Sequence, residues 1–410
     1  MEKVKYLILG AGPAGLTFAN RLKELSEDSF LVLEKEQEAG GLCRSVMVDG
    51  SPFDIGGGHF LDVRRPAVNT FLFRFMPKEE WKLFERDSRI VIGDQQVGHP
   101  LEANIWQLPV DSQVEVLSSI ARSGCNSGKQ KPGKFKDWII WKLGDRIAEM
   151  YMLPYNRKMF ADELDELGTY WLEKLPDVSF EDTLRSCLEH RAYGKQPGHA
   201  SFYYPEKYGY GELWLRMAAE IASNILYQVD VTGIDLEKKT VTAADGRIWE
   251  AEYIITTIPW RSFETIEGMP QEIVSSVKKL KSSAIETRYI GEKLDTKAQW
   301  LYIPDEKKPY HRILVRHNFC QGSRGYWLET RKERVSLYRE EAEFTYMNEY
   351  AYPLNTVGKP EIMDRLLGFC RTKGVYGLGR WGEHCHYNSD LVVELALKLA
   401  EKMYEESKMD

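Results

Sequence analysis

The chain has 410 residues, of which 43% are hydrophobic and 29% are charged. These proportions are ordinary for a globular protein, and the length predicts two domains or one elaborated domain. The formal net charge of -7 gives no reason to expect attraction to nucleic acid or to an anionic membrane. Any anionic ligand therefore has to be held by local arginine and lysine side chains.

The sequence also excludes several classes of protein. No apolar run approaches the ~20 residues of a membrane-spanning helix, and the first apolar run passes into a glycine motif rather than into a signal-peptide cleavage site. The six cysteines are scattered and form no C-x-x-C pair, which predicts reduced thiols and argues against a disulfide scaffold and a zinc site. We therefore expect a cytoplasmic protein without a metal ion.

The first motif is an apolar run over residues 4–9 followed by three glycines, Gly10, Gly12 and Gly15. The spacing G-x-G-x-x-G predicts a strand, a tight turn and a helix whose N-terminus faces a pyrophosphate. A second apolar run ends at Glu34, where a carboxylate would bind ribose hydroxyls. A glycine-rich turn can also be purely structural, but the strand before it and the helix after it favour a dinucleotide site, for NAD or FAD.

More glycines follow at three places. Gly40 and Gly41 precede Arg44, residues 56–58 are all glycine and lead into His59, and Gly379 and Gly382 flank Arg380 near the end of the chain. Bare backbone of this kind marks a tight turn or a close approach to a flat or bulky group. With the first motif present, the glycines before His59 favour contact with an isoalloxazine ring, and therefore FAD over NAD.

The remaining patterns predict how the chain is divided. Apolar residues recur at helical spacing from about 114 to 190, and a turn at Asp245-Gly246 predicts a hairpin. Residues 253–259 form a predicted buried strand, and residues 282–345 are rich in predicted strands. A helix from about Asp390 to Tyr404 is predicted to close the chain.

The predicted fold class is α/β, with a Rossmann-like FAD-binding domain and interleaved helical and antiparallel-sheet substrate regions. The FAD-binding domain is discontinuous and comprises residues 1–95, 196–265 and 346–410. Residues 96–195 form a mainly helical substrate or lid region, and residues 266–345 form a β-rich substrate region.

These motifs together resemble the FAD-dependent amine oxidase superfamily, which includes protoporphyrinogen oxidase. Within it, the chain is similar to the UDP-galactopyranose mutases. The ten-residue spacing from Tyr302 to Arg312 agrees with the tyrosine-to-arginine segment of the eukaryotic members. The other matching segments are residues 97–105 (the uridine-side loop), 154–160 (Pro-Tyr-Asn), 352–353 and 379–383, in the family's order.

The resemblance implies a role for each matching residue. Arg312 would clamp a sugar-nucleotide diphosphate, because a guanidinium fork matches phosphate oxygens, and His59 would adjoin the flavin ring. The residues implied in catalysis are His59, Lys174, Tyr302, Arg312, Tyr352 and His386; those implied in cofactor binding are Gly10, Gly12, Gly15, Glu34, Gly41, Arg44, Gly57, Gly58, Gly379, Arg380 and Asn388; those implied in substrate binding are His99, Glu102, Asn156 and Phe160. Plainer alternatives are a surface salt bridge for Arg312 and core packing for the two tyrosines and Phe160.

Three departures from the mutase pattern leave the substrate open. Lys174 stands where the family has a second diphosphate arginine, and lysine supplies a charge without a fork. His99 and Glu102 replace a tyrosine and a glutamine of the uridine-side loop, so a carboxylate there could select a base with N–H donors. His386 falls where the family has a substrate tyrosine. The sugar nucleotide therefore need not be UDP-galactose.

The resemblance implies a flavin-dependent sugar-nucleotide mutase, an isomerase that interconverts the pyranose and furanose rings of a nucleoside-diphosphate sugar. Non-covalently bound FAD, active when reduced, would attack the anomeric carbon through N5 and form a flavin–sugar adduct. The alternatives are an FAD-dependent oxidase or dehydrogenase of the amine oxidase or protoporphyrinogen oxidase type, and a non-catalytic flavoprotein that binds a nucleotide sugar. The expected partners are the sugar nucleotide and NAD(P)H or another reductant, with a homo-oligomer left open and no nucleic acid or membrane.

Overall fold

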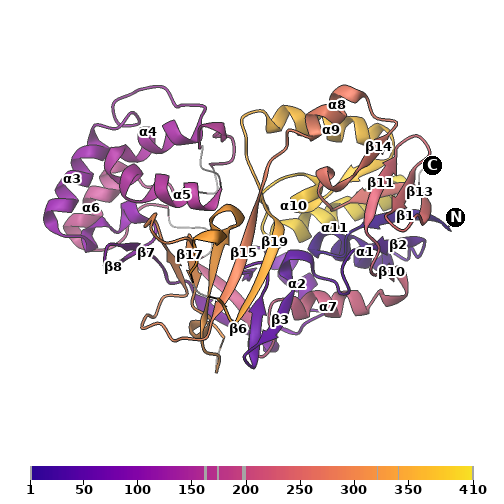
Figure 1. Ribbon diagram of the computed structural model, residues 1–410, viewed down its shortest axis with the longest axis horizontal. Coiled ribbons are helices and arrows are strands. Elements are labelled where there is room, and N and C mark those ends of the chain that lie inside the picture. Colours follow the sequence, from indigo (N-terminus) through magenta and orange to yellow (C-terminus); the bar gives the residue numbers. More distant parts are fainter. Residues whose placement is uncertain are drawn as a thin grey trace.

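The computed structural model of the chain describes residues 2–160, 164–172, 175–195, 200–320, 322–339 and 341–408. Figure 1 shows a helical region at one end of the long axis, an antiparallel sheet in the middle, and a mainly parallel sheet with its helices at the other end. Within the described residues, no helix combines the length and the apolar character needed to cross a bilayer.

The first sheet carries the N-terminal glycine motif. Its order, over the described residues, is β10-β2-β1-β13-β12-β11-β14, with β20 also paired to β13. The bounds are Glu2–Leu9 for β1, Phe30–Leu33 for β2, Ile225–Leu226 for β10, Val231–Asp235 for β11, Thr240–Ala243 for β12, Ile248–Thr256 for β13, Thr265–Glu267 for β14 and Val375–Gly377 for β20. Parallel pairing aligns Leu9 with Leu33 and Thr256, and Thr256 with Gly377, so four strands end at one edge.

Both faces of this sheet are covered by helices, which explains why β1 and β2 are continuous apolar runs. Tyr6 and Ile8 pack in one buried cluster and Leu7 and Leu9 in another, because side chains alternate along a strand. Residues from α1 (Pro13–Glu24), α7 (Gly211–Ala219) and α11 (Ser389–Glu406) belong to the first cluster, and residues from α8 (Gln271–Val277) and α9 (Lys359–Thr372) to the second.

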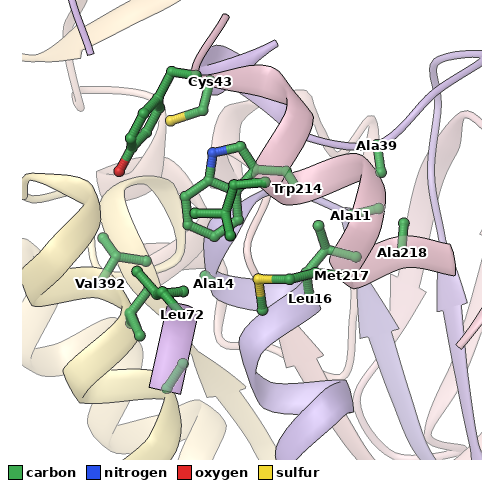
Figure 2. Close-up of a cluster of buried hydrophobic side chains, with 14 of the residues drawn as sticks. Ala11, Ala14, Leu16, Ala39, Cys43, Leu72, Trp214, Met217, Ala218 and Val392 are labelled. Carbon is green, nitrogen blue, oxygen red and sulfur yellow. The ribbon is translucent and has the colours of Figure 1, made fainter. Parts of the chain in front are cut away.

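The glycine turn rests on a packed base. In Figure 2, Ala11, Ala14 and Leu16 lie against the side chains that α7 and α11 contribute, which include Trp214 and Val392. The side-chain amide of Asn20 in α1 donates hydrogen bonds to the carbonyl oxygens of Leu16 and Met217, at 2.9 and 3.0 Å, and so links α1 to α7. Each large apolar side chain buried here contributes about 1.5–3 kcal/mol, which fixes the turn to the core.

The second sheet has the order β19-β15-β18-β17-β16-β7-β8 in the part of the chain that the structure describes. Its strands are β7 (Ser88–Ile92), β8 (Gln95–Gly98), β15 (Ser282–Ile290), β16 (Trp300–Tyr302), β17 (Arg312–Leu314), β18 (Tyr326–Arg331) and β19 (Phe344–Pro353). All pairs are antiparallel except β7 with β16. The register places Arg312 directly between Tyr302 and Glu329, so these three side chains stand on one face.

The helical region consists of α3 (Val110–Ala121), α4 (Phe135–Ile147), α5 (Leu153–Met159) and α6 (Phe180–Glu189), with a π-helical turn at Ala148–Met152 between α4 and α5. Two small sheets join the regions. They pair β3 (Ser45–Val48) with β4 (Ser51–Asp54), and β9 (Ser201–Pro205) with β5 (Leu61–Asp62) and β6 (Trp81–Glu85). The described residues also include the short helices α2 (Pro66–Leu72) and α10 (Gly379–Gly382).

The predicted fold class is confirmed. The helical stretch, the hairpin, in which Val241 pairs with Trp249, and the closing helix α11 are all present. The second sheet takes strands from outside the predicted β-rich region: β7 lies within residues 1–95 and most of β19 within residues 346–410. The division of the chain into cofactor and substrate regions stays a prediction.

Candidate cofactor and substrate site

A cavity of about 550 Å³ opens at the edge where β1, β2 and β13 end. Cavities of this size accommodate small molecules and cofactors, and parallel α/β sheets bind ligands at the carboxyl ends of their strands. The residues lining it include Gly10, Gly12, Glu34, Gly41, Arg44 and Arg380, all predicted to bind cofactor, together with His59, Thr257 and Tyr346.

Glycine shapes the turn after β1. Gly10 has a φ of +100°, which residues with a side chain rarely adopt. A Cβ atom on Gly15 would lie 2.0 Å from the carbonyl oxygen of Gly10, so α1 packs directly on the turn. A Cβ on Gly12 would meet only the Cα of Gly41, at 3.9 Å. Gly12 thus leaves room beside the N-terminus of α1, where a pyrophosphate would accept hydrogen bonds.

Glu34 follows β2 and is buried next to this turn. Its Oε2 accepts a hydrogen bond from the N–H of Ala11 at 2.6 Å, and its Oε1 accepts one from the N–H of Glu36 at 2.9 Å. Burial raises the pKa of Glu34 against the opposing effect of these hydrogen bonds and of Arg44. Because each carboxylate oxygen can accept more than one hydrogen bond, Glu34 can also bind ribose hydroxyls.

Two arginines bring positive charge to the cavity. Arg44 donates hydrogen bonds to the Glu36 carboxylate at 3.2 Å and to the Tyr346 hydroxyl at 2.6 Å. Arg380 donates to the backbone carbonyls of Tyr387 and Ala351, at 2.8 to 3.1 Å, and no carboxylate of the described residues pairs with it. The N–H groups of a glycine turn at a helix N-terminus, a buried carboxylate acceptor and two cations together fit a flavin dinucleotide.

The glycines at 56–58 have a different explanation from the one that the sequence suggested. A Cβ on Gly56 would overlap the Leu42 carbonyl, one on Gly57 would lie 2.2 Å from Oε1 of Glu329, and one on Gly58 would lie 2.0 Å from the Leu314 side chain. The space beside these three glycines, where we expected the isoalloxazine ring, is therefore occupied by protein atoms. Neither Gly57 nor Gly58 is among the residues that line the cavity, and a role for them in cofactor binding stays a prediction.

His59 lies at the end of these glycines and does line the cavity. Burial and the positive charge of Arg380 lower the pKa of His59 to about 4, so the imidazole is neutral at pH 7. Its Nδ1 lies 3.0 Å from the carbonyl oxygen of Gly57. Because a carbonyl can only accept, Nδ1 carries the proton and Nε2 is left as an acceptor.

Arg312 is held by a buried carboxylate. Its Nε donates a hydrogen bond to Oε2 of Glu329 at 2.9 Å, and one Nη donates to the same oxygen and, at 3.3 Å, to the Tyr352 hydroxyl. Burial would raise the pKa of Glu329, but Arg312 and His311 overcome it and lower this pKa to about 2. The other Nη of Arg312 and Oε1 of Glu329 have no hydrogen-bond partner among the described residues.

The neighbours of Arg312 extend the site in both directions. The Tyr302 hydroxyl accepts a hydrogen bond from Arg86 at 2.8 Å, and the Tyr352 ring lies 4.8 Å from the His386 ring. We call Arg86, Tyr302, Arg312 and Tyr352 the arginine–tyrosine row. His59 and Arg380, which line the cavity, connect it to this row. The guanidinium carbon of Arg380 lies 5.9 Å from the centre of the Tyr352 ring, and His59 Nδ1 lies 3.0 Å from the carbonyl oxygen of Gly57, a residue against which the Glu329 carboxylate packs.

Two of the other predicted residues, His99 and Phe160, lie beside this row. The His99 ring is 4.9 Å from the Tyr302 ring, and the Phe160 ring is 6.3 Å from the Tyr352 ring. Glu102 is buried, which raises its pKa to about 7, and the Asn156 amide donates to the carbonyl oxygen of Met152 at 2.7 Å. Gly379 begins α10 and Asn388 is at the N-cap of α11, and Lys174 lies outside the described residues. Their roles stay predictions.

Sequence reasoning missed three residues of this site, Arg86, Glu329 and Tyr346. Glu329 had a signal, because it is a carboxylate that directly follows the apolar run Tyr326-Trp327-Leu328 in a predicted strand. Arg86 and Tyr346 had none, because their neighbours come from distant parts of the chain.

Comparison with known proteins agrees with this geometry. The solved structure of a reduced UDP-galactopyranose mutase is similar with a TM-score of 0.87 and 22% identity, covering 98% of this chain and 94% of that chain. A putrescine oxidase with bound putrescine has a TM-score of 0.64 and 14% identity, covering 98% of this chain and 99% of that chain. At these identities the likeness describes the fold.

Two comparisons of sequence add to these structural similarities. A curated but uncharacterized protein encoded in the nifH2 3′ region of Methanothermococcus thermolithotrophicus is 45% identical over 53 residues, which are 13% of this chain and 50% of that protein. The chain thus matches about half the length of that curated relative. The model of the family described as flavin containing amine oxidoreductase matches residues 13–291, more than half of the chain, and indicates a flavin as the cofactor. The chain therefore belongs to the flavin containing amine oxidoreductase family.

Proposed function

We propose that this chain is a flavin-dependent sugar-nucleotide mutase, which interconverts the ring forms of a nucleoside-diphosphate sugar with non-covalently bound, reduced FAD. The observation that carries the proposal is the arginine–tyrosine row, a set of hydrogen-bond donors suited to phosphate that adjoins the cavity at His59. The similarity to a structure of reduced UDP-galactopyranose mutase supports the same reaction class.

Arg312 is suited to hold the diphosphate. Glu329 Oε2 holds one edge of the guanidinium through Nε and one Nη, and the Nη without a described partner is left to donate to a phosphate oxygen. The hydroxyls of Tyr302 and Tyr352 stand on either side of it as further donors. Since the leaving diphosphate gains negative charge, donors fixed in advance stabilise it most as the bond to the sugar breaks.

Arg380 and His59 face the reacting end. Arg380 has only carbonyl partners among the described residues, so its charge is available to a ligand in the cavity. Neutral His59 offers Nε2 as a hydrogen-bond acceptor for a sugar or cofactor N–H or O–H group. Reduced FAD, when bound, would supply an electron-rich N5 as the nucleophile for the anomeric carbon.

The test is a panel of UDP-, GDP- and dTDP-sugars. Binding is followed by quenching of the fluorescence of the bound flavin, and turnover is followed by chromatography with and without dithionite. We expect at least one sugar nucleotide to bind, and its ring isomerisation to require the reduced flavin.

Two results would contradict the proposal. Oxygen consumption with peroxide formation from an amine or a porphyrin-like substrate would favour an oxidase, as the similarity to putrescine oxidase allows. Binding of a sugar nucleotide with no isomerisation of any sugar after reduction would favour a non-catalytic flavoprotein.

A further inference from the structure

Arg86 is enclosed by aromatic and neutral groups. It lies between β6 and β7, and its guanidinium carbon is 4.8 Å from the centre of the Trp300 ring and 5.7 Å from that of the Phe60 ring. Its Nε donates a hydrogen bond to the Ser88 hydroxyl at 2.7 Å, and one Nη donates to the Tyr302 hydroxyl at 2.8 Å. These contacts orient the guanidinium, and ring faces attract its charge.

No carboxylate of the described residues lies within ion-pair distance of Arg86. Arg89, three positions later, shows the ordinary arrangement: its guanidinium forms two hydrogen bonds to the Asp87 carboxylate, at 2.9 and 2.8 Å. Arg86 is partly buried and lacks such a partner, so its charge is not neutralised by the protein. A fixed, partly buried and unneutralised guanidinium is suited to an anionic ligand.

The strand that carries Tyr302, β16, lies between β17, which carries Arg312, and β7, which begins two residues after Arg86. Arg86 donates to the Tyr302 hydroxyl, and Arg312 is the cross-strand neighbour of Tyr302. Phe60, whose ring faces Arg86, directly follows His59 in the chain. Two cations separated by one phenol match a diphosphate, which carries negative charge on both of its phosphoryl groups.

We infer that Arg86 is a second diphosphate-binding arginine, which acts with Arg312 and Tyr302 on the nucleoside-diphosphate sugar. The inference rests on the proposed function. It assigns to Arg86 the role that the resemblance gave to Lys174, and it makes recognition of the diphosphate depend on a guanidinium that the sequence pattern did not reveal.

The experiment measures ligand binding by isothermal titration calorimetry to the flavin-loaded protein. The probes are UDP, GDP, dTDP, their monophosphates UMP, GMP and dTMP, and inorganic pyrophosphate, and the variants are Arg86→Gln, Arg86→Lys and Lys174→Ala. We expect Arg86→Gln to weaken the binding of the tightest nucleoside diphosphate and of pyrophosphate about 10- to 100-fold, because a charged hydrogen-bond donor is lost. The binding of the monophosphates should weaken less, and Arg86→Lys should retain part of the affinity.

Arg89→Ala is the matched control, because it removes an equal charge from the same segment but leaves the row intact. Unchanged flavin content and melting temperature of the Arg86 variants establish that they are folded. If Arg86→Gln does not fold, the comparison is made with Arg86→Lys. The Tyr302→Phe variant tests whether Arg86 binds the diphosphate directly or only orients the Tyr302 hydroxyl. If Arg86 binds the diphosphate itself, adding Arg86→Gln to Tyr302→Phe causes a further loss.

The outcomes distinguish the two proposals. If the wild-type protein binds a nucleoside diphosphate and Arg86→Gln binds it equally well, or if only Lys174→Ala weakens it, the role of Arg86 is wrong and the proposed function stands. If the wild-type protein binds none of the diphosphates, the proposed function fails and the inference fails with it.

Discussion

The cofactor cavity and the arginine–tyrosine row meet at His59, but they are built in different ways. Most of the predicted cavity residues lie within residues 10–44, and they act through a turn, a helix N-terminus and backbone N–H groups. The row draws on positions 86, 302, 312 and 352 and acts through arginine and tyrosine side chains. Local shape therefore specifies the first region, and contacts between distant segments of the chain specify the second.

This difference predicts different costs of substitution. In the cavity, a change should act through packing of atoms against the turn, because few charges are paired there. In the row, a change should act through an uncompensated charge, because Glu329 is fully buried and ionised by its neighbours.

The largest effect is expected for Arg312→Ala. The variant leaves the Glu329 carboxylate buried without its main partner, and we expect the free energy of unfolding to fall by about 3–5 kcal/mol at pH 8. Without Arg312, burial raises the pKa of Glu329 above its unfolded value, so the loss should be smaller near pH 5, where Glu329 can take up a proton. Urea unfolding at both pH values measures this.

The control removes both charges. Arg312→Met with Glu329→Leu should restore most of the stability, since a buried ion pair contributes little relative to apolar side chains, yet it should not restore binding of a nucleoside diphosphate. An Arg312→Ala protein as stable as the wild type would show that the row is not held by this pair.

The second effect concerns a buried contact between the segment after α10 and the start of β15. His384 follows α10, is buried, and its Nε2 lies 3.0 Å from the carbonyl oxygen of Lys281, next to the start of β15. Burial and nearby Lys359 lower the pKa of His384 to about 4, below the value of about 6.5 in an unfolded chain. Its contribution to stability is therefore complete above pH 6.5 and is lost as the pH falls toward 4, by about 3 kcal/mol in total.

The measurement compares the wild type with His384→Gln, whose amide can bond the same carbonyl but does not titrate. The difference between their free energies of unfolding should change with pH between 4 and 6.5 and be constant above it. Asp54 and Glu383, whose pKa values burial raises to about 7, titrate equally in both proteins and cancel in the difference. A difference that is flat across this range would contradict the assignment.

The fold was largely predictable because its signals are local. Continuous apolar runs at β1 and β2, the helical spacing after residue 114 and the Asp245-Gly246 turn each act over a few residues. Strand membership in the second sheet was not predictable in the same way. β7 joins β16, more than 200 positions away, and nothing in residues 88–92 identifies that partner.

The candidate site was likewise predictable where its signals are local and not where they depend on distant residues. Gly10, Gly12 and Glu34 were placed at the cavity by spacing alone, and they line it. Gly57 shows the limit of this reasoning, since bare backbone indicates a close neighbour without saying which: here it is the Glu329 carboxylate. The partner of Arg312 likewise depends on the register of β17 with β18.

A smaller effect is expected in the glycine turn. Gly15→Ala places a methyl group 2.0 Å from the Gly10 carbonyl, so we expect a loss of about 1–3 kcal/mol in the free energy of unfolding, together with loss of flavin. Gly12→Ala meets only the Cα of Gly41 and should leave the fold stable while lowering the flavin content. The ratio of flavin to protein absorbance and urea unfolding measure both. If Gly12→Ala retains the wild-type flavin content, the pyrophosphate does not lie against Gly12.

The smallest effect is expected for Tyr352→Phe. The hydroxyl accepts one long hydrogen bond from Arg312, at 3.3 Å, and Glu329 holds Arg312 in place without it. We therefore expect the free energy of unfolding to change by less than about 1 kcal/mol, and the affinity for a nucleoside diphosphate to fall about 3- to 10-fold, as for one neutral hydrogen bond. Calorimetric titration measures this. A loss as large as that of Arg312→Ala would mean that the row depends on its phenols as much as on its charges, and that Tyr352 orients Arg312 instead of assisting it.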